Sequence, residues 1–322
     1  MKTAIISGVS GQDGAYLSAL LLHKGYRVVG LIRHRAFQNL KNLEYLKVSA
    51  DVILEECDLL NLSDTMKLIK KYNPDEIYHL AAQSSVGLSF EQPVETVNFN
   101  ILSTLNFLES IRKIDLKIKF YHASSSEMFG ESIMGLPITE KTPMNPLSIY
   151  ATSKVASHFL AVNYRQIYGV FVGIGILFNH ESVLRSNNFF VKKIIIEALK
   201  IKTKQQKILK VGNISVKRDF GYSPKYVEAM HLIMQHKIPD SFIVCTGRSY
   251  LLSDILNFVY DYLDIDRNLI VVDENLYRHT EIHDIYGDNS KIKTELNWEY
   301  KYDFYQVLEI MINEMMHSHV KS

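Results

Sequence analysis

Short apolar runs alternate with segments of helical periodicity along the first half of the chain. Runs at 4–6, 28–32, 52–54, 76–80, 118–121 and 170–178 predict buried strands. Between the fourth and fifth runs, Val97, Ile101, Leu105 and Leu108 recur at the spacing of one helical face. Buried strands that alternate with helices are typical of an α/β fold with a parallel, doubly wound sheet.

A glycine-rich turn follows the first predicted strand. Gly8 and Gly11 precede a helix predicted over 13–24, and Gly14 lies in its first turn. At such a junction, glycines permit a tight turn, let the backbone approach a pyrophosphate and let the helix pack closely, and the helix N-terminus favours the anion. The spacing is GxxGxxG rather than the usual GxGxxG, so an ordinary strand-turn-helix junction is the alternative. The strand-helix context favours a Rossmann-type dinucleotide site.

The second predicted strand ends in two arginines. Arg33 and Arg35 flank His34 at its carboxyl end. An acidic residue there would bind a ribose 2′-hydroxyl, whereas arginine suits a 2′-phosphate. We therefore expect NADP as the cofactor, with NAD as a possible alternative if the basic turn is only solvated.

Polar or small residues follow each of the predicted strands. Because ligands of doubly wound sheets bind beyond the carboxyl ends of the strands, these residues are expected to line one crevice. After about residue 180 the pattern becomes irregular, which indicates a smaller C-terminal substrate-binding lobe. The expected division is a dinucleotide-binding domain over 1–178, which also carries the catalytic groups, and a lobe over 179–322 interwoven with it.

A tyrosine and a lysine share one face of a predicted helix. Tyr150 and Lys154 lie four residues apart. A nearby ammonium group stabilises a phenolate and so lowers the pKa of tyrosine, which could then act as a base toward a carbinol hydroxyl. The chain has 19 tyrosines, so a chance surface pair is the alternative. The position of the pair downstream of the hydroxyl-rich segment 124–127 favours the catalytic interpretation.

Glu127 helps to distinguish between the reactions that such a site could catalyse. A dehydrogenase or a 4-epimerase needs tyrosine, lysine and a hydroxyl group, but no carboxylate base. A 4,6-dehydratase needs such a base, because a ketone at C4 acidifies the proton at C5 and a carboxylate can remove it as the C6 hydroxyl leaves. The alternative is a structural cap or ion pair. The combination predicts a sugar-nucleotide oxidoreductase or dehydratase.

Composition excludes several other classes. The formal net charge of +1 in 322 residues gives no field that would favour nucleic acid or an anionic membrane. Cys57 and Cys245 show no paired spacing, and neither a signal peptide nor a long apolar segment is evident, so we expect a soluble cytoplasmic protein. The segment 279–283 (HTEIH) lacks the glutamate position of a zinc helix, and no metal is expected.

Several motifs carry a family resemblance. The segments 10–17 (SGQDGAYL), 80–84 (LAAQS), 124–130 (SSSEMFG) and 177–182 (LFNHES) resemble those of the GDP-mannose 4,6-dehydratases, a branch of the extended short-chain dehydrogenase/reductase family. The similarity runs nearly from end to end. It implies an NADP-dependent hydro-lyase that converts GDP-mannose to GDP-4-keto-6-deoxymannose, in a homodimer or homotetramer.

The resemblance also implies a role for individual residues. The catalytic set is Ser125, Glu127, Tyr150 and Lys154, with Ser125 where the family usually has threonine. The cofactor set is Gly8, Gly11, Gln12, Asp13, Gly14, Arg33, Arg35, Asp58, Leu59, Leu80, Ala81, Ala82, Gln83, Tyr150, Lys154, His180 and Arg185. The substrate set is Ser84, Ser126, Asn179, Glu181, Lys193, Arg218, Arg278 and Glu281.

Departures from the family pattern keep alternatives open. Ala36 and Phe37 stand where serines usually hold the 2′-phosphate, and Val183 and Leu184 replace a proline-containing stretch. Most of the other departures lie in the substrate lobe. The alternatives are a dehydratase of another nucleotide sugar, such as a GDP-heptose, an epimerase or 4-keto reductase of the same family, and a weakened dinucleotide-binding module.

Overall fold

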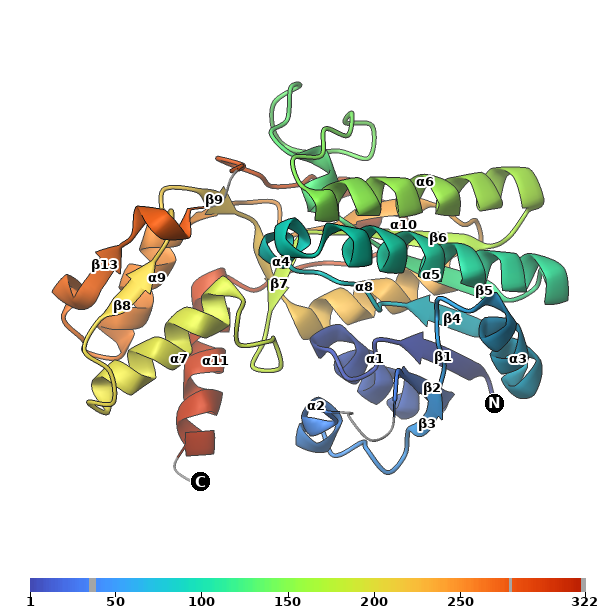
Figure 1. The fold of residues 1–322 in the computed structure, drawn as a ribbon, viewed down its shortest axis with the longest axis horizontal. Helices are drawn as coiled ribbons and strands as arrows, with labels where there is room; N and C mark the ends of the chain where they lie inside the picture. Colours follow the sequence, from blue (N-terminus) through green and yellow to red (C-terminus); the bar gives the residue numbers. More distant parts are fainter. Residues whose placement is uncertain (35–38, 278–279, 320–322) are drawn as a thin grey trace.

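A parallel sheet forms the centre of the protein (Figure 1). The computed structural model describes residues 1–34, 39–277 and 280–319. Its main sheet has seven strands in the order β11-β6-β5-β4-β1-β2-β3, and every neighbouring pair is parallel. The order reverses at β1 and β4, which confirms the predicted doubly wound, Rossmann-type sheet. The strands are β1 (Thr3–Ser7), β2 (Arg27–Ile32), β3 (Ile53–Glu56), β4 (Glu76–His79), β5 (Lys119–Ser125), β6 (Val172–Leu177) and β11 (Ser241–Val244).

Helices cover both faces of this sheet, because successive side chains of each strand point to opposite faces. Ile5 and Phe120 belong to the core beneath α3 (Leu62–Tyr72), α5 (Pro93–Ile114) and α6 (Ile149–Tyr168). Ile6 and Tyr121 belong to the core beneath α1 (Gln12–His23) and α8 (Ser223–Gln235). Both cores consist mainly of buried aliphatic and aromatic side chains, so the sheet is a firm support for residues at its edge. The remaining helices near the sheet are α2 (Lys41–Tyr45), α4 (Val86–Glu91), the 3₁₀ helix η2 (Ser126–Phe129) and α10 (Ser290–Leu296).

The helix that carries Tyr150 and Lys154 has clear start and stop signals. The Ser148 side chain accepts a hydrogen bond from the Ala151 amide at the N-terminus of α6, and Gly169 ends the helix at φ +69°. Both candidate residues therefore lie in the first two turns, next to the end of β5.

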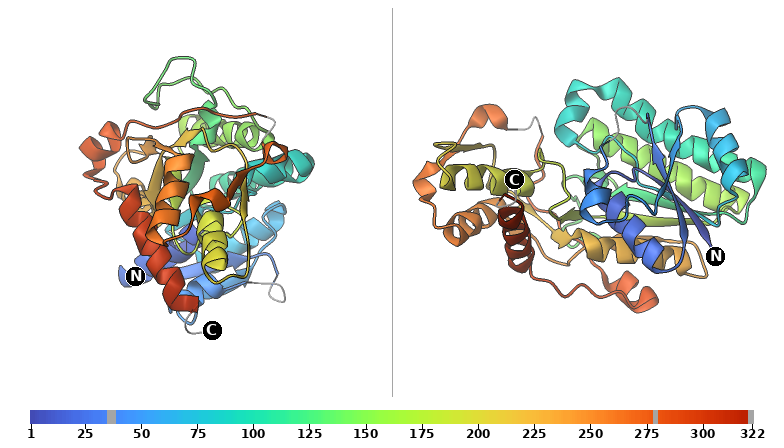
Figure 2. Two further views of the ribbon diagram at one scale, coloured as in Figure 1. Left: turned by 90° about the vertical axis from the view of Figure 1, so that its left-hand side faces the viewer. Right: turned by 90° about the horizontal axis from the view of Figure 1, so that it is seen from below.

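A smaller lobe lies beside the carboxyl ends of the main strands, at the left of Figure 1. It has its own core, which includes Ile195, Leu256, Phe304 and Leu308. Figure 2 shows the lobe from two further sides. Its elements are α7 (Phe190–Lys202), α9 (Leu252–Tyr262), α11 (Phe304–His319), the 3₁₀ helices η3 (Arg267–Leu269) and η4 (Glu274–Leu276), and the strands β8 (Leu209–Val211), β9 (Lys217–Arg218), β12 (Tyr250–Leu251) and β13 (Ile270–Val272); β7 (Asn179–Glu181) and β10 (Phe220–Tyr222) join it to the sheet.

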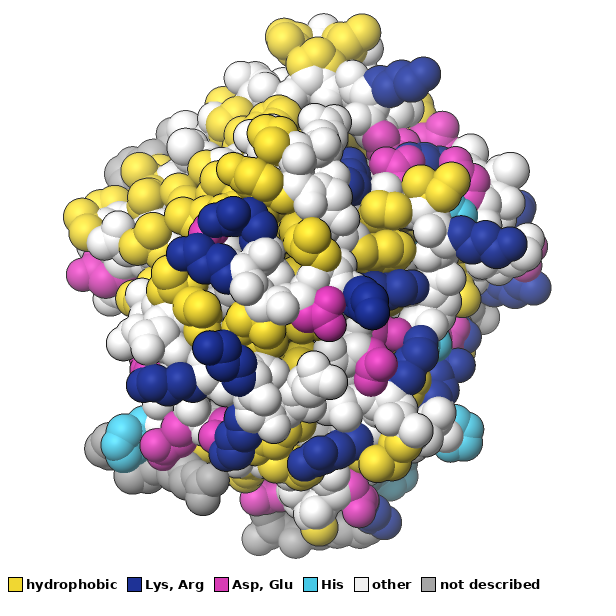
Figure 3. All heavy atoms as spheres, turned by 90° about the vertical axis from the view of Figure 1, so that its right-hand side faces the viewer, with side chains coloured by type: hydrophobic (Ala, Val, Ile, Leu, Met, Phe, Trp, Pro, Cys, Tyr) yellow, Lys and Arg dark blue, Asp and Glu magenta, His cyan; other side chains and the backbone are white. Residues whose placement is uncertain are grey.

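The surface opposite the smaller lobe mixes all side-chain types. In Figure 3, lysine and arginine side chains lie among acidic and hydrophobic ones rather than in one basic stripe. Across the described ranges, none of the helices combines the length and the apolar character that a bilayer crossing requires.

Candidate active site

A large cavity opens where the main strands end and the smaller lobe begins. Its volume is about 1470 Å³, and the ends of the six strands predicted from the sequence contribute to its wall. Most residues predicted for catalysis, cofactor or substrate therefore meet at one place. These are Gly8, Gly11, Gln12, Asp13, Gly14, Arg33, Asp58, Leu80, Ala81, Ala82, Gln83, Ser84, Ser125, Glu127, Tyr150, Lys154, Asn179, His180, Glu181, Arg185, Lys193, Arg218 and Glu281.

Two predicted residues lie elsewhere, and two lie outside the described residues. The Leu59 side chain packs in the core beneath α3 and α5, and its neighbour Leu60 lines the cavity instead. Ser126 begins η2 and is buried away from the cavity wall, because the chain turns inward directly after β5. Leu59 and Ser126 therefore do not line the cavity, and their assignments stay predictions; Arg35 and Arg278 are outside the described part of the chain.

The glycine loop has the close packing that its sequence predicts. A Cβ atom on Gly14 would lie 2.2 Å from the Gly8 carbonyl oxygen, and one on Gly8, whose φ is +74°, would lie 2.9 Å from the Ala81 amide nitrogen. No larger residue fits without moving the backbone. The loop thus places the N-terminus of α1 at the wall of the cavity.

Ser125, Glu127 and Tyr150 form the candidate catalytic group. Ser125 ends β5, and its hydroxyl accepts a hydrogen bond from the Glu127 amide at 3.3 Å, which fixes the start of η2. The pKa of Tyr150 is raised to about 12, chiefly by burial; the Glu127 carboxylate also raises it, whereas a hydrogen bond with Ser125 and the charge of Arg185 lower it. The sequence-based expectation of a lowered tyrosine pKa is therefore wrong for the protein by itself, because helical spacing says nothing about desolvation.

Lys154 is buried beneath this group. Its ammonium nitrogen donates to the carbonyl oxygen of Ala123 at 2.8 Å, and burial lowers its pKa to about 8. The side chain is thus held against β5 by the backbone. It lies in position to touch a ligand in the cavity, since it is one of the lining residues.

The substrate end of the cavity is built by the smaller lobe. Arg218 is buried, donates to the carbonyl oxygens of Lys217 and Ile282, and lies 3.8 Å from a Glu281 carboxylate oxygen. Its guanidinium is therefore held in place before any ligand arrives. This lobe also contributes lining residues that were not among the predicted site residues: Gly212, Asn213, Val216, Phe220, Leu252 and Leu276.

Residues 5–311 match the sequence profile of the family described as GDP-mannose 4,6 dehydratase. The chain belongs to this family. It is 39% identical to GDP-mannose 4,6 dehydratase 1 of Arabidopsis thaliana over 97% of this chain and 89% of that protein. It is 33% identical to the GDP-mannose 4,6 dehydratase of Homo sapiens over 99% of this chain and 92% of that one.

Solved structures share the fold of this GDP-mannose 4,6-dehydratase family member. UDP-glucose 4-epimerase from Thermotoga maritima, solved with UDP-glucose, superposes with a TM-score of 0.87 at 20% identity, covering 98% of this chain and 99% of that chain. RMD from Pseudomonas aeruginosa, complexed with NADPH, gives a TM-score of 0.83 at 23% identity, covering 99% and 100%. At these identities the likeness concerns the fold.

Two contacts of this family member were not foreseen. The Arg33 guanidinium lies over the Phe99 ring of α5, 5.5 Å from its centroid. The side chains of Asp13 and His180, predicted separately as cofactor residues, lie in hydrogen-bond contact at 2.8 Å. The partners in each contact are separated by many residues, and no local pattern in the sequence joins them.

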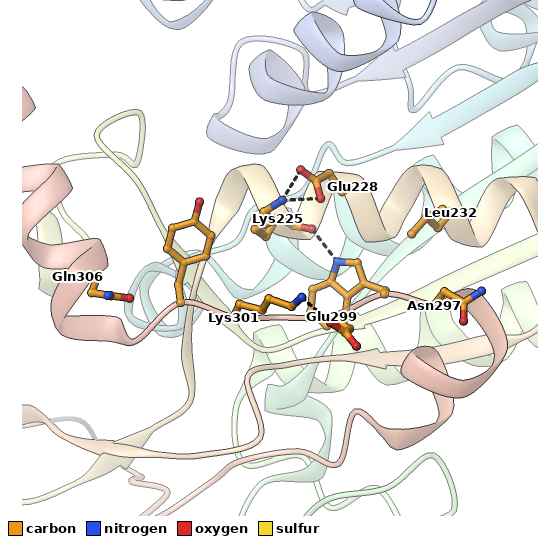
Figure 4. Close-up of a pocket in the computed structure, with 9 residues that line it drawn as sticks. Lys225, Glu228, Leu232, Asn297, Glu299, Lys301 and Gln306 are labelled. Atoms are coloured by element: carbon orange, nitrogen blue, oxygen red, sulfur yellow. Dashed lines mark hydrogen bonds and ion pairs between the residues drawn. The ribbon is translucent and has the colours of Figure 1, made fainter.

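A second hollow lies apart from the strand ends, between α8 and the segment 297–306 (Figure 4). Its volume is about 590 Å³. Lys225 is paired there with Glu228, and Lys301 with Glu299, so its charges are already neutralised locally. None of the residues that line this second hollow is among those predicted for catalysis, cofactor binding or substrate binding.

Proposed function

We propose that the protein is an NADP-dependent GDP-mannose 4,6-dehydratase that forms GDP-4-keto-6-deoxymannose. The observation that carries this proposal is the placement of Glu127 on the same cavity wall as Ser125 and Tyr150, in a chain that matches the family over nearly its whole length. A carboxylate beside a hydroxyl–tyrosine–lysine set adds proton abstraction to carbinol oxidation, which is the chemistry of a dehydratase.

We assign each proton transfer of the reaction to a residue of the cavity. The glycine loop and Lys154 would hold a dinucleotide, which when bound would supply the reversible hydride acceptor that the reaction needs. Tyr150 takes the proton of the C4 hydroxyl, and the Ser125 hydroxyl hydrogen-bonds the C4 oxygen as it becomes a ketone. Glu127 then removes the C5 proton. Because Ser126 lies off the wall, we assign to Glu127 the return of that proton to the C6 hydroxyl, which leaves as water.

The overall reaction should be redox-neutral. We expect incubation with GDP-mannose, without added reductant, to yield a product lighter by one water, with no net change in NADPH absorbance. Mass spectrometry of the products from a panel of nucleotide sugars measures this and identifies the preferred sugar. Stoichiometric production or consumption of NADPH would instead identify a dehydrogenase or a reductase.

We propose that Arg33 selects NADP over NAD. It lines the cavity at the end of β2 near Asp58, and the contact with Phe99 limits the freedom of its guanidinium. We expect Arg33→Ala to weaken NADP binding about tenfold or more, since a charge-assisted hydrogen bond contributes roughly 1.5–3 kcal/mol, and to leave NAD binding nearly unchanged. Fluorescence titration with both cofactors measures this.

Arg27→Ala is the matched control for Arg33→Ala. Arg27 is exposed at the opposite end of the same strand, away from the cavity. It should not change the ratio of NADP to NAD affinity. Equal affinity of the wild-type protein for both cofactors would show that Arg33 is only a solvated surface residue and would favour NAD.

The division of labour and the assembly are also proposals. We assign cofactor binding and catalysis to residues 1–178 and nucleotide-sugar binding to 179–322, with β11 and α8 woven back onto the sheet. A homodimer or homotetramer is supported by exposed apolar side chains on the outer faces of α5 and α6, including Leu102, Phe159 and Ile167. The buried, unbonded state of Cys57 and Cys245 is consistent with the expected cytoplasmic location.

A further inference from the structure

A hydrogen-bonded pair of side chains, Asp13 and His180, joins the first turn of α1 to β7. The Nε2 atom of His180 lies 2.8 Å from an Asp13 carboxylate oxygen, and the Nδ1 atom lies 2.7 Å from the carbonyl oxygen of Phe178. The His180 side chain is 8% exposed and that of Asp13 is 20% exposed. Both ring nitrogens therefore face oxygen acceptors in a site largely sheltered from water.

Only one protonation state lets the ring donate to both acceptors. A neutral imidazole has one N–H, whereas the imidazolium has two. A carbonyl oxygen can only accept, so the alternative is a neutral pair in which Asp13 carries the proton and donates it to Nε2. The other Asp13 oxygen already accepts from the Ser223 hydroxyl at 2.8 Å and from the Gln12 amide at 3.3 Å. These donors favour the ionised carboxylate, and so the ion pair.

The surroundings of the pair support the same assignment. Burial, the largest single influence, raises the pKa of Asp13, but His180, the Ser223 hydroxyl and the charge of Arg185 together lower that pKa to about 2. The Tyr226 ring of α8 stacks on the imidazole with centroids 4.4 Å apart and planes at 23°. Arg185 adds positive charge near the pair, while Glu181 is buried next to it and its burial raises its pKa.

The position of Asp13 indicates what the pair does. Asp13 lies in the first turn of α1, where the glycine loop presents free amides to a phosphate. An unpaired carboxylate at this point would repel the pyrophosphate that the helix is placed to bind. Deepening the cofactor part of the proposed function, we infer that His180 is a positioning residue held as an imidazolium, which cancels the charge of Asp13 at the phosphate-binding end of α1.

The same contacts tie the cofactor loop to the substrate side. The Gln12 side-chain amide nitrogen also donates to the His180 backbone carbonyl oxygen at 3.1 Å, and the Ser182 hydroxyl donates to the Gln12 side-chain oxygen Oε1 at 2.7 Å. Ser223, whose hydroxyl donates a hydrogen bond to the Asp13 carboxylate, begins α8. The first turn of α1 is thereby fixed to segments far along the chain, so the pair sets both the charge and the place of the phosphate site.

A double-mutant cycle separates charge cancellation from simple packing. His180→Gln keeps a donor of similar length but removes the positive charge, and we expect it to weaken NADP binding about tenfold or more. Adding Asp13→Asn removes the uncompensated negative charge, and the double variant should recover to within about threefold of the wild-type affinity. Isothermal titration with NADP measures all four proteins. Lys225→Gln, which removes a surface cation of α8 outside the main cavity, is the control and should bind as the wild type does.

The protonation state of the His180 ring can also be observed directly, which tests the inference if a variant does not fold. In long-range ¹H–¹⁵N spectra of the cofactor-free wild-type protein at neutral pH, both His180 ring nitrogens should carry protons, with the signal assigned by its loss in His180→Gln or His180→Asn. A single-protonated ring, or a double variant that binds NADP no better than His180→Gln, would overturn the inference. Because neither experiment uses a sugar, failure of GDP-mannose as the substrate would leave this result intact.

Discussion

Glu127→Gln should lower the rate of dehydration by roughly 10²–10⁴ while C4 oxidation continues. The amide keeps the shape of the side chain, and with it the start of η2 that the Glu127 backbone amide and Ser125 define, but it cannot accept the C5 proton. Enzyme-bound NADPH should therefore accumulate when GDP-mannose is added. Stopped-flow absorbance follows the NADPH, and mass spectrometry in deuterated water should find no deuterium at C5.

Glu91→Gln provides the control for this experiment. Glu91 is an exposed carboxylate at the end of α4 and does not line the cavity. Its replacement should leave the rate unchanged. Dehydration by Glu127→Gln at nearly the wild-type rate would show that another group removes the C5 proton, and the assignment of Glu127 would be wrong.

Lys154→Met should inactivate the enzyme and stabilise the cofactor-free protein at pH 7. Burial lowers the pKa of Lys154 from 10.5 to about 8, so below pH 8 the fold must hold a buried charge that the unfolded chain exposes to water. Between these two values the unfolded chain binds the proton that the folded chain has released, so the free energy of unfolding rises with pH across that window. Methionine removes this penalty, by an amount on the order of 2–3 kcal/mol at pH 7.

Thermal and denaturant unfolding at several pH values test this expectation. The advantage of Lys154→Met should shrink as the pH rises from about 8 to 10.5. Lys67→Met, on an exposed lysine of α3, should show no such trend. A less stable Lys154→Met protein at pH 7 would mean that the hydrogen bond to Ala123 outweighs the desolvation of the ammonium group.

The order of elements in the first half of the chain could be predicted because its strands are buried on both faces. Uninterrupted apolar runs such as 4–6 and 28–32 leave little choice of structure. β3 was placed slightly early, at 52–54 instead of Ile53–Glu56, because it is an edge strand whose end carries exposed glutamate. β11 was missed as a member of the main sheet, since its short run pairs with a strand far away in the sequence.

The candidate site was predictable wherever residues lie at the end of a main-sheet strand or just after it. Ser125, Asn179 and Gly8 are examples, and all line the cavity. Contacts between distant segments were not predictable, because nothing local links Asp13 to His180 or Ser223. Leu59 and Ser126 do not line the cavity although their neighbours Leu60 and Ser125 do, because successive side chains at the end of a strand point in opposite directions. Environment was also hidden from the sequence: it is burial, not helical spacing, that determines the pKa of Tyr150.

The strand order also determines which parts of the sheet can form while the chain is still being synthesised. β6 ends at Leu177, but its outer partner β11 begins only at Ser241, after much of the smaller lobe has been synthesised. In that interval the nascent chain already carries Ser125, Glu127 and Lys154, while β6 is an open edge and α8 has not yet covered its face of the sheet. A transcript truncated after residue 178 should consequently yield an aggregation-prone fragment, and chaperone engagement should concentrate on chains that have not yet reached β11.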